Sequence, residues 1–209
     1  MAQILKFPVR AAKFGYKRVR KHARKEENPA QLHLFGQVTA QVLQFAPALG
    51  HFEHALLLDE RGDPRAVDVY LKAIEQQDCL ADSFCNLGII ESKLGRITQA
   101  FDCFTNCLKH DPRHFEAHYN LGNMYFEVND FRLARVHYEM ANQLDPSFPN
   151  AYFNLALVLS INSEFVDAIA ALNKYQQLVS PEEGRIADEL LDNLKKSLAA
   201  AKNSRANVT

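Results

Sequence analysis

Residues 114–126 read HFEAHYNLGNMYF, and this stretch decides the fold because its pattern returns along the chain. The pair Leu121–Gly122 stands midway between Leu87–Gly88 and Leu155–Ala156, at equal spacing from each. A small residue follows thirteen positions after each leucine, and a bulky one four positions later: Ala100 and Phe104, Ala134 and Tyr138, Ala168 and Leu172. A fixed period of about 34 residues is typical of helical hairpins that stack into an array.

The residues between these positions indicate why each unit is helical. Apolar side chains recur at three- and four-residue spacing, which predicts two amphipathic helices per unit. Asp111–Pro112 and Asp145–Pro146 lie one period apart, and proline stops or starts a helix because it lacks an amide donor. One hairpin alone cannot bury its apolar face, so neighbouring hairpins must stack. The sequence therefore predicts an all-α solenoid of antiparallel helix pairs.

The repeated unit resembles the tetratricopeptide-repeat (TPR) family at nearly every signature position. Where the family often has tryptophan, this chain has Phe84, His118 and Tyr152. A degenerate earlier copy carries Ala66, Tyr70 and Ala73, and its turn is one residue shorter. The resemblance implies a right-handed superhelix of four repeats, with the boundaries 47–80, 81–114, 115–148 and 149–182.

The segments that flank the repeats have different predicted roles. Residues 183–202 are expected to form a helix that caps the fourth repeat through an apolar stripe: Ile186, Leu190, Leu191, Leu194 and Leu198. The tail 203–209 is expected to fray. Residues 29–46 form a linker whose apolar side chains could pack on the first repeat, and residues 1–28 are expected to be a disordered arm.

Charge is distributed very unevenly along the chain. Residues 1–25 carry nine Lys and Arg and no acid, whereas the remaining residues carry 15 Lys and Arg against 25 Asp and Glu. Such an arm can contact nucleic acid or another anionic surface weakly and without sequence specificity. The residues assigned to this contact are Lys17, Arg18, Arg20, Lys21, Arg24 and Lys25. Docking on another copy, targeting and simple solubilisation remain alternatives.

The lack of a recognisable targeting signal and the pattern of cysteines together predict a cytoplasmic protein. The sequence has no apolar run long enough for a transmembrane segment and no recognisable secretory signal. Its four cysteines all lie between Cys79 and Cys107, a pattern that fits a reducing compartment better than a disulfide framework.

A row of asparagines identifies the candidate binding site. Asn86, Asn120 and Asn154 recur at the repeat period on the first helix of each hairpin, which in this family lines the concave groove. A side-chain amide both donates and accepts, so a ladder of amides can pair with the backbone of an extended peptide. The predicted groove consists of this ladder and its neighbours, namely Asn86, Asn120, Asn154, Asn123, Tyr119, Phe126, Phe153 and Leu157. The sequence thus predicts a non-catalytic protein–protein interaction scaffold that binds a peptide or helix of a partner.

The sequence gives weaker support to other kinds of site. The family's carboxylate clamp needs paired Lys, Asn and Arg and is absent here, because the matching positions hold Cys85, Tyr119 and Phe153, with Ile89, Asn123 and Leu157. Cys103 and Cys107, followed by three histidines, have soft-ligand chemistry, but buried packing explains the cysteines more simply. No metal site, cofactor or catalytic motif is predicted.

A second and looser resemblance concerns the order of segments. A basic stretch, residues 29–35, the sequence from Phe52 to Leu56 and a repeat array together look similar to the C-terminal part of bacterial MerR-type regulators. This resemblance favours the alternative function, a regulatory protein that uses its basic arm. Self-association through the face of the first repeat is a further possibility.

Overall fold

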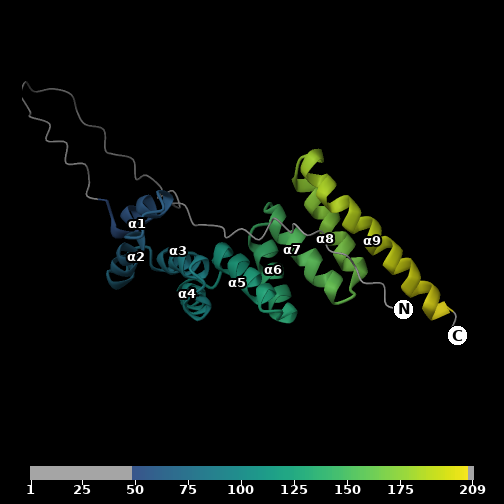
Figure 1. Cartoon of the computed structure of the whole chain (residues 1–209), viewed down its shortest axis with the longest axis horizontal. Coiled ribbons are helices and arrows are strands. Elements are labelled where there is room, and N and C mark those ends of the chain that lie inside the picture. The colour runs from purple at the N-terminus through teal and green to yellow at the C-terminus, as the bar shows by residue number, and fades with distance from the viewer. Residues whose placement is uncertain (1–48, 207–209) are drawn as a thin grey trace, which may run out of the picture.

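The computed structural model describes residues 49–206, and every regular element in this range is an α-helix. Figure 1 shows the helices following one another in an elongated stack. Their bounds are α1 (His51–Glu60), α2 (Ala66–Glu75), α3 (Leu80–Lys93), α4 (Ile97–His110), α5 (Phe115–Glu127), α6 (Phe131–Leu144), α7 (Pro149–Ile161), α8 (Phe165–Leu178) and α9 (Pro181–Ala206).

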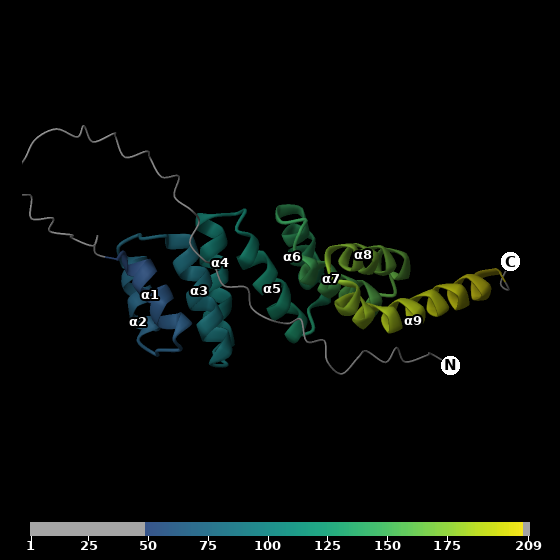
Figure 2. The same ribbon diagram turned by 90° about the horizontal axis from the view of Figure 1, so that it is seen from above.

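Consecutive helices pair into hairpins, and each hairpin packs on the next. The pairs α1–α2, α3–α4, α5–α6 and α7–α8 contact each other, and each second helix contacts the first helix of the following unit. Figure 2 shows the same progression along the stack from a second direction. The leucines that defined the period, Leu87, Leu121 and Leu155, are all buried at equivalent sites of α3, α5 and α7. The prediction of an all-α stack of helix pairs is confirmed.

Two glycines allow the helices of a hairpin to approach closely. A Cβ added at Gly122 would lie 2.6 Å from the Tyr138 ring, and one at Gly88 would lie 2.9 Å from the Phe104 ring. Both distances are far below ordinary van der Waals contact. In the fourth repeat the equivalent bulky residue is Leu172 instead of an aromatic ring, and the equivalent small residue is Ala156. At these two positions an alanine would therefore require the ring of Phe104 or Tyr138 to shift.

The turn inside each hairpin uses one residue with positive φ at a repeating position. These residues are Gly62, Gly95, Asn129 and Ser163, with φ between 62° and 73°. Glycine adopts this conformation freely and asparagine tolerates it, whereas serine accepts it at a cost. The step from Gly62 to Gly95 is one position shorter than the later steps, which matches the shorter first turn expected from the sequence.

The connections between hairpins fall into two types. In the second and third connections, the Asp111 carboxylate accepts the backbone N–H of Arg113 at 2.9 Å, and Asp145 accepts that of Ser147 at 3.0 Å. Each aspartate thus stabilises the turn next to its proline by accepting a backbone N–H. The first connection has no such Asp–Pro pair and instead places Gln77 and Cys79 at positive φ.

The last helix closes the end of the stack. It buries Ala187, Leu190, Leu191 and Leu194, and it packs against α8. Of the predicted stripe, Ile186 is 46% exposed, because Ala187 instead faces the core one turn before Leu190 and Leu191. The helix begins at Pro181, whose fixed φ suits a first turn, and it continues past the expected end at 202 as far as Ala206.

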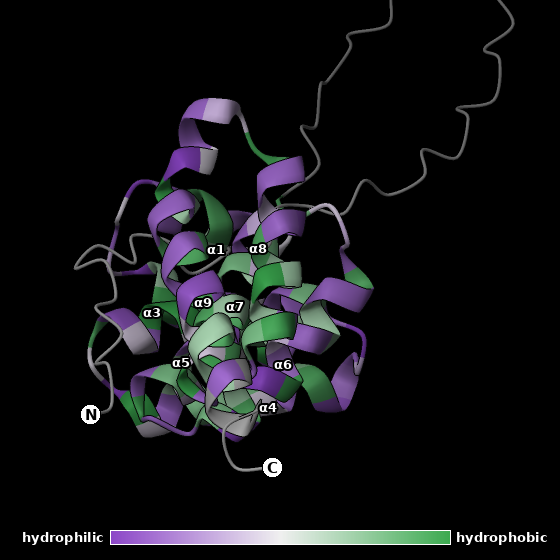
Figure 3. Ribbon diagram, turned by 90° about the vertical axis from the view of Figure 1, so that its right-hand side faces the viewer, coloured by the Kyte–Doolittle hydropathy of each residue, from purple (hydrophilic) through white to green (hydrophobic). Residues whose placement is uncertain are grey.

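The fourth repeat has the most thoroughly buried helix. From Phe153 to Ser160 every residue of α7 is buried, since α5, α6 and α8 pack against this helix. Figure 3, a view along the stack, shows hydrophobic residues gathered toward the middle and hydrophilic residues toward the outside. Within the described range, no helix is both long and apolar enough to cross a membrane.

Candidate peptide-binding site

The asparagine ladder lies on three consecutive leading helices. Asn86 is on α3, Asn120 on α5 and Asn154 on α7, and α5 contacts both α3 and α7. All three side chains are fully buried. The structure therefore brings the predicted ladder residues onto adjacent helices, inside the protein and not on its open surface.

Hydrogen bonds join the ladder across repeats. The Asn154 amide donates from Nδ2 to Oδ1 of Asn123 at 3.0 Å, which ties α7 to α5. The same Oδ1 accepts the Tyr138 hydroxyl at 2.8 Å, so Asn123 also connects α5 to α6. One step earlier, Asn120 Nδ2 lies 3.9 Å from Cys85 Sγ, a weak donor contact between α5 and α3.

One atom of the ladder residue Asn154 and one of its neighbour Asn123 keep unused hydrogen-bonding capacity. Asn154 Oδ1 and Asn123 Nδ2 are buried, and neither makes a hydrogen bond of normal geometry within the described residues. One is an acceptor and the other a donor, and their two side chains are already bonded to each other. A peptide backbone presents the complementary pair of groups.

Aromatic and aliphatic residues surround these amides. Tyr119 is fully buried and packs edge-to-face on Phe148 with ring centroids 4.9 Å apart. Burial raises the pKa of Tyr119 to about 12, although the amides of Asn123 and Asn154 beside its hydroxyl partly offset this. Phe153 packs edge-to-face on Tyr175 at 5.2 Å, and Leu157 is buried in the same core cluster. These residues build the core between repeats.

Phe126 is the one predicted groove residue that is partly exposed. It lies near the end of α5 and packs against Phe131 with ring centroids 5.4 Å apart. The other seven predicted groove residues are buried, so a partner reaches them only by displacing the groups that cover them.

The structure also assembles a cluster that the sequence interpretation missed. Cys85 on α3, Cys107 on α4 and His114 at the start of α5 place their sulfur and nitrogen atoms within 4.8 Å of one another. All three are buried. The hydrogen bond from Cys85 and the neighbouring His114 lower the pKa of Cys107 to about 7 against the effect of burial, whereas burial raises the pKa of Cys85.

The soft-ligand group considered from the sequence is divided among three places. Cys107 and His114 belong to the new cluster, but Cys103 belongs to the core of the first hairpin. His110 stacks on Phe84 at 5.8 Å, and His118 faces His137. The signal for the cluster was Cys85, which takes the position that Tyr119 and Phe153 fill with rings.

His118 and His137 form a second titratable pair. Their Nδ1 atoms are 3.0 Å apart, and His118 Nε2 lies 3.1 Å from the carbonyl oxygen of Pro112. Because a carbonyl only accepts, Nε2 of His118 carries its proton and Nδ1 of His118 accepts from His137. Burial and then His118 lower the pKa of His137 to about 4, and burial lowers the pKa of His118.

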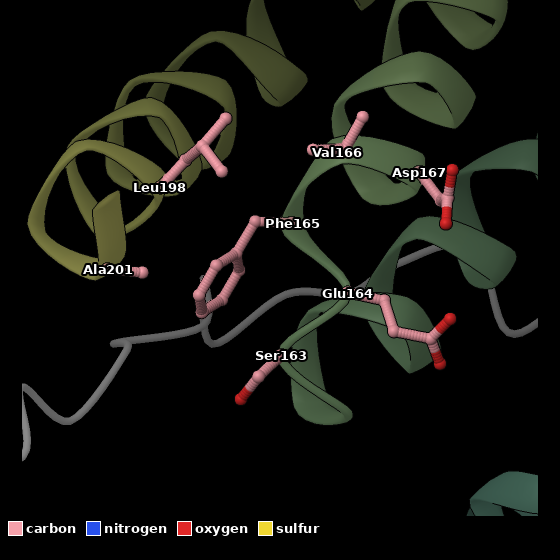
Figure 4. Close-up of a pocket in the computed structure, with 7 residues that line it drawn as sticks. All are labelled: Ser163, Glu164, Phe165, Val166, Asp167, Leu198 and Ala201. Atoms are coloured by element: carbon pink, nitrogen blue, oxygen red, sulfur yellow. The ribbon is translucent and has the colours of Figure 1, made fainter. Parts of the chain in front are cut away.

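Open hollows also occur on the surface. Figure 4 shows one between the start of α8 and the end of α9, with the Phe165 ring pointing toward the α9 side. It has a volume of about 480 Å³ and is lined by Ser163, Glu164, Phe165, Val166, Asp167, Leu198 and Ala201. None of the predicted site residues lines it.

Part of what the sequence predicts falls outside the described residues. This part comprises the arm residues Lys17, Arg18, Arg20, Lys21, Arg24 and Lys25, the segment 29–46, and the last three residues of the tail. The resemblance to MerR-type regulators depends largely on these segments, so it stays a prediction. Contact with nucleic acid, self-association and a cytoplasmic location stay predictions as well.

Comparison with known proteins agrees with the repeat pattern. Tetratricopeptide-repeat family profiles match residues 81–114, 103–136 and 122–160. YrrB, described as a TPR protein with an unusual peptide-binding site, superposes with a TM-score of 0.58 at 20% identity, over 73% of this chain and 90% of that one. The fold is a tetratricopeptide-repeat solenoid.

Two further TPR proteins are similar to this chain. The first TPR of Spaghetti (RPAP3), solved with an HSP90 peptide, superposes with a TM-score of 0.52 at 22% identity, over 57% of this chain and 93% of that one. The TPR-containing protein trd-1 of Caenorhabditis elegans is 24% identical over 192 residues. That alignment covers 86% of this chain but only 24% of trd-1, so the chain spans about a quarter of this relative's length.

Proposed function

We propose that this protein is a non-catalytic interaction scaffold that binds a peptide or helix of a partner protein along its leading helices α3, α5 and α7. The observation that carries the proposal is the buried amide pair Asn123–Asn154, in which Asn154 Oδ1 and Asn123 Nδ2 make no hydrogen bond of normal geometry within the described residues. An unsatisfied buried polar atom costs free energy, and a ligand backbone that pairs with it recovers this cost. This gives the leading helices a specific means of holding an extended chain.

Two proteins of the same fold have peptide ligands, which supports a peptide as the class of ligand but not any particular peptide. RPAP3 was solved with a peptide from HSP90, and YrrB is described by its peptide-binding site. The shared fold does not carry over their ligands. The clamp positions differ here, with Cys85, Tyr119 and Phe153 in place of charged groups, so a ligand recognised by its terminal carboxylate is not expected.

Peptide selection tests the proposal directly. A displayed library of random peptides would be selected on the full chain, and the affinity of the winners measured by calorimetry. Changing Asn120→Ala and Asn154→Ala together should weaken binding about tenfold for each hydrogen bond lost, with a smaller effect on the thermal midpoint.

The chain offers a matched control for this double change. Asn142 is also a buried asparagine, but it lies on the second helix α6, away from the ladder. Asn142→Ala should leave peptide affinity unchanged. If the ladder variant and the control bind the selected peptides equally well, the ladder does not hold the ligand.

A truncated chain addresses the cover over the ladder. Deleting residues 1–28 tests whether this segment covers the buried asparagines and must move aside before a peptide can bind. Tighter peptide binding by the truncated chain would place part of the cover there, and equal binding would place it elsewhere. Either result is informative only together with the ladder variant, which tests the site itself.

A further inference from the structure

The junction between the second and third repeats departs from the pattern of the other junctions. Cys85, Cys107 and His114 occupy the positions that Tyr119, Ala141 and Phe148 occupy one period later. At the later junction Tyr119 and Phe148 pack as rings 4.9 Å apart. An apolar set of contacts is thus replaced at one junction by two thiols and an imidazole.

These three side chains have the composition and spacing of a soft metal site. Their donor atoms lie within 4.8 Å of one another. Tetrahedral zinc with two sulfurs and one nitrogen needs donor atoms about 3.5–3.8 Å apart, so closure by about 1 Å is sufficient. We propose that Cys85, Cys107 and His114 form a buried zinc site that joins α3, α4 and α5.

Asp82 gives the imidazole the orientation that such a site needs. Nε2 of His114 lies 2.9 Å from Oδ1 of Asp82, which only accepts, so the ring proton is on Nε2. Nδ1 accepts the backbone N–H of Ala117, so in this arrangement it carries no proton and can bind a metal. A carboxylate behind a ligating histidine is the usual outer partner in zinc sites.

Metal binding at Nδ1 has an identifiable cost. This atom accepts the backbone N–H of Ala117 at 3.2 Å, a long cap bond at the start of α5. The metal would replace that bond. Glu116 Oε2 lies 3.7 Å from Nδ1, but it is not one of the three donors that lie within 4.8 Å of one another. A fourth ligand would therefore be water, or Glu116 after its side chain has moved.

Solvent reaches the outer edge of this cluster. A surface hollow of about 280 Å³ is lined by Asp82 together with Cys79, Leu80, Ala81 and Asp111. The side chain of Asp82 is 19% exposed, and that of His114 behind it is 2% exposed. The hollow therefore reaches Asp82, the hydrogen-bond partner of His114, but none of the three ligands lines it.

Cobalt is the probe for this site. The full chain, reduced and stripped with a chelator, would be titrated with Co²⁺ and then with Zn²⁺. We expect one cobalt per chain, a sulfur-to-cobalt charge-transfer band, visible bands of tetrahedral intensity, and displacement by zinc. Zinc should also raise the thermal midpoint, because it binds the folded chain.

The repeats themselves supply variants that preserve the fold. Cys107→Ala introduces the residue found at Ala141, and His114→Phe introduces the residue found at Phe148. Both should abolish the charge-transfer band while circular dichroism stays helical. Asp82→Asn should weaken zinc binding about 10- to 100-fold without removing it.

Cys103→Ala is the matched control, since Cys103 is buried on the same helix as Cys107 but outside the cluster. It should bind cobalt like the unchanged chain. The proposal is overturned if cobalt gives only weak octahedral bands, or if binding persists in both the Cys107 and His114 variants. The proposal is also overturned if the reduced chain takes up no metal and forms a Cys85–Cys107 disulfide once an oxidant such as oxidised glutathione is added, the two thiols being oxidised as the glutathione disulfide is reduced.

Discussion

The junction between repeats two and three and the junction between repeats three and four share a backbone pattern but differ in chemistry. At the later junction Tyr119 packs on Phe148, and nearby rings fill the remaining space. At the earlier junction Cys85 and His114 stand in the same positions and are linked to polar neighbours. The repeat therefore determines where side chains meet, and the local residues determine whether the meeting place is apolar packing or a cluster of donors.

Replacing one residue at each junction by alanine should show the largest difference in stability between the apolar junction and the donor cluster. Tyr119→Ala removes a fully buried ring and should lower the free energy of unfolding by about 3–5 kcal/mol. Cys85→Ala removes one sulfur and a weak contact and should cost about 1 kcal/mol in the absence of metal. Urea denaturation of chelator-treated chains measures both. Equal losses would show that the ring cluster does not dominate its junction.

The sequence predicted the architecture well because the period is a property of packing. Leu87, Leu121 and Leu155 had to be equivalent once the period was recognised, and the structure buries all three. The end of the last helix was less predictable. Residues 203–206 extend α9, and Ile186 turned out to be exposed, because a single apolar stripe does not fix which flank of the stripe meets the core.

The glycines provide a second comparison, this time within the hairpins. A Cβ at residue 122 would lie 2.6 Å from the Tyr138 ring, closer than the 2.9 Å from the Phe104 ring at residue 88. Gly122→Ala should therefore cost about 2–3 kcal/mol, and Gly88→Ala about 1–2 kcal/mol, through overpacking. Thermal unfolding of the two variants tests this order.

A double change checks the physical reason. Combining Gly122→Ala with Tyr138→Leu reproduces the pairing of Ala156 and Leu172 in the fourth repeat. If the glycine is required by the ring, the alanine should cost less in this background than alone. An unchanged cost would point to the backbone of α5 and not to the ring.

The candidate sites were harder to predict than the fold. The asparagine ladder was visible because it repeats, but its burial and the bond between Asn123 and Asn154 depend on how neighbouring helices pack. The cluster of Cys85, Cys107 and His114 was missed because its members come from two different helices and from the residue that caps a third, and the two cysteines are far apart in the sequence. Contacts between helices are not expressed as a local motif.

The smallest expected effect is the pH dependence of the free energy of unfolding that His137 causes. This histidine is in the third repeat, and the fourth repeat has alanine at the same position. His137 has a pKa of about 4 in the folded chain, against about 6.5 for a histidine in an unfolded chain. As pH falls from about 6.5 to 4, the unfolded chain binds a proton that folded His137 does not bind. The free energy of unfolding should therefore decrease across this window and level off below it.

The expected loss is about 1 kcal/mol, because solvent around the half-buried ring reduces the full effect of the pKa shift. His137→Ala introduces the residue that the fourth repeat has at Ala171, and it should flatten the profile between pH 6.5 and about 4. Urea denaturation of the unchanged chain and the variant across this range gives the difference in free energy of unfolding. The contribution of carboxylates is the same in both chains and drops out of this difference. A profile equally steep in the variant would mean that the facing Nδ1 atoms of His118 and His137 do not oppose protonation, and that another group carries the acid sensitivity.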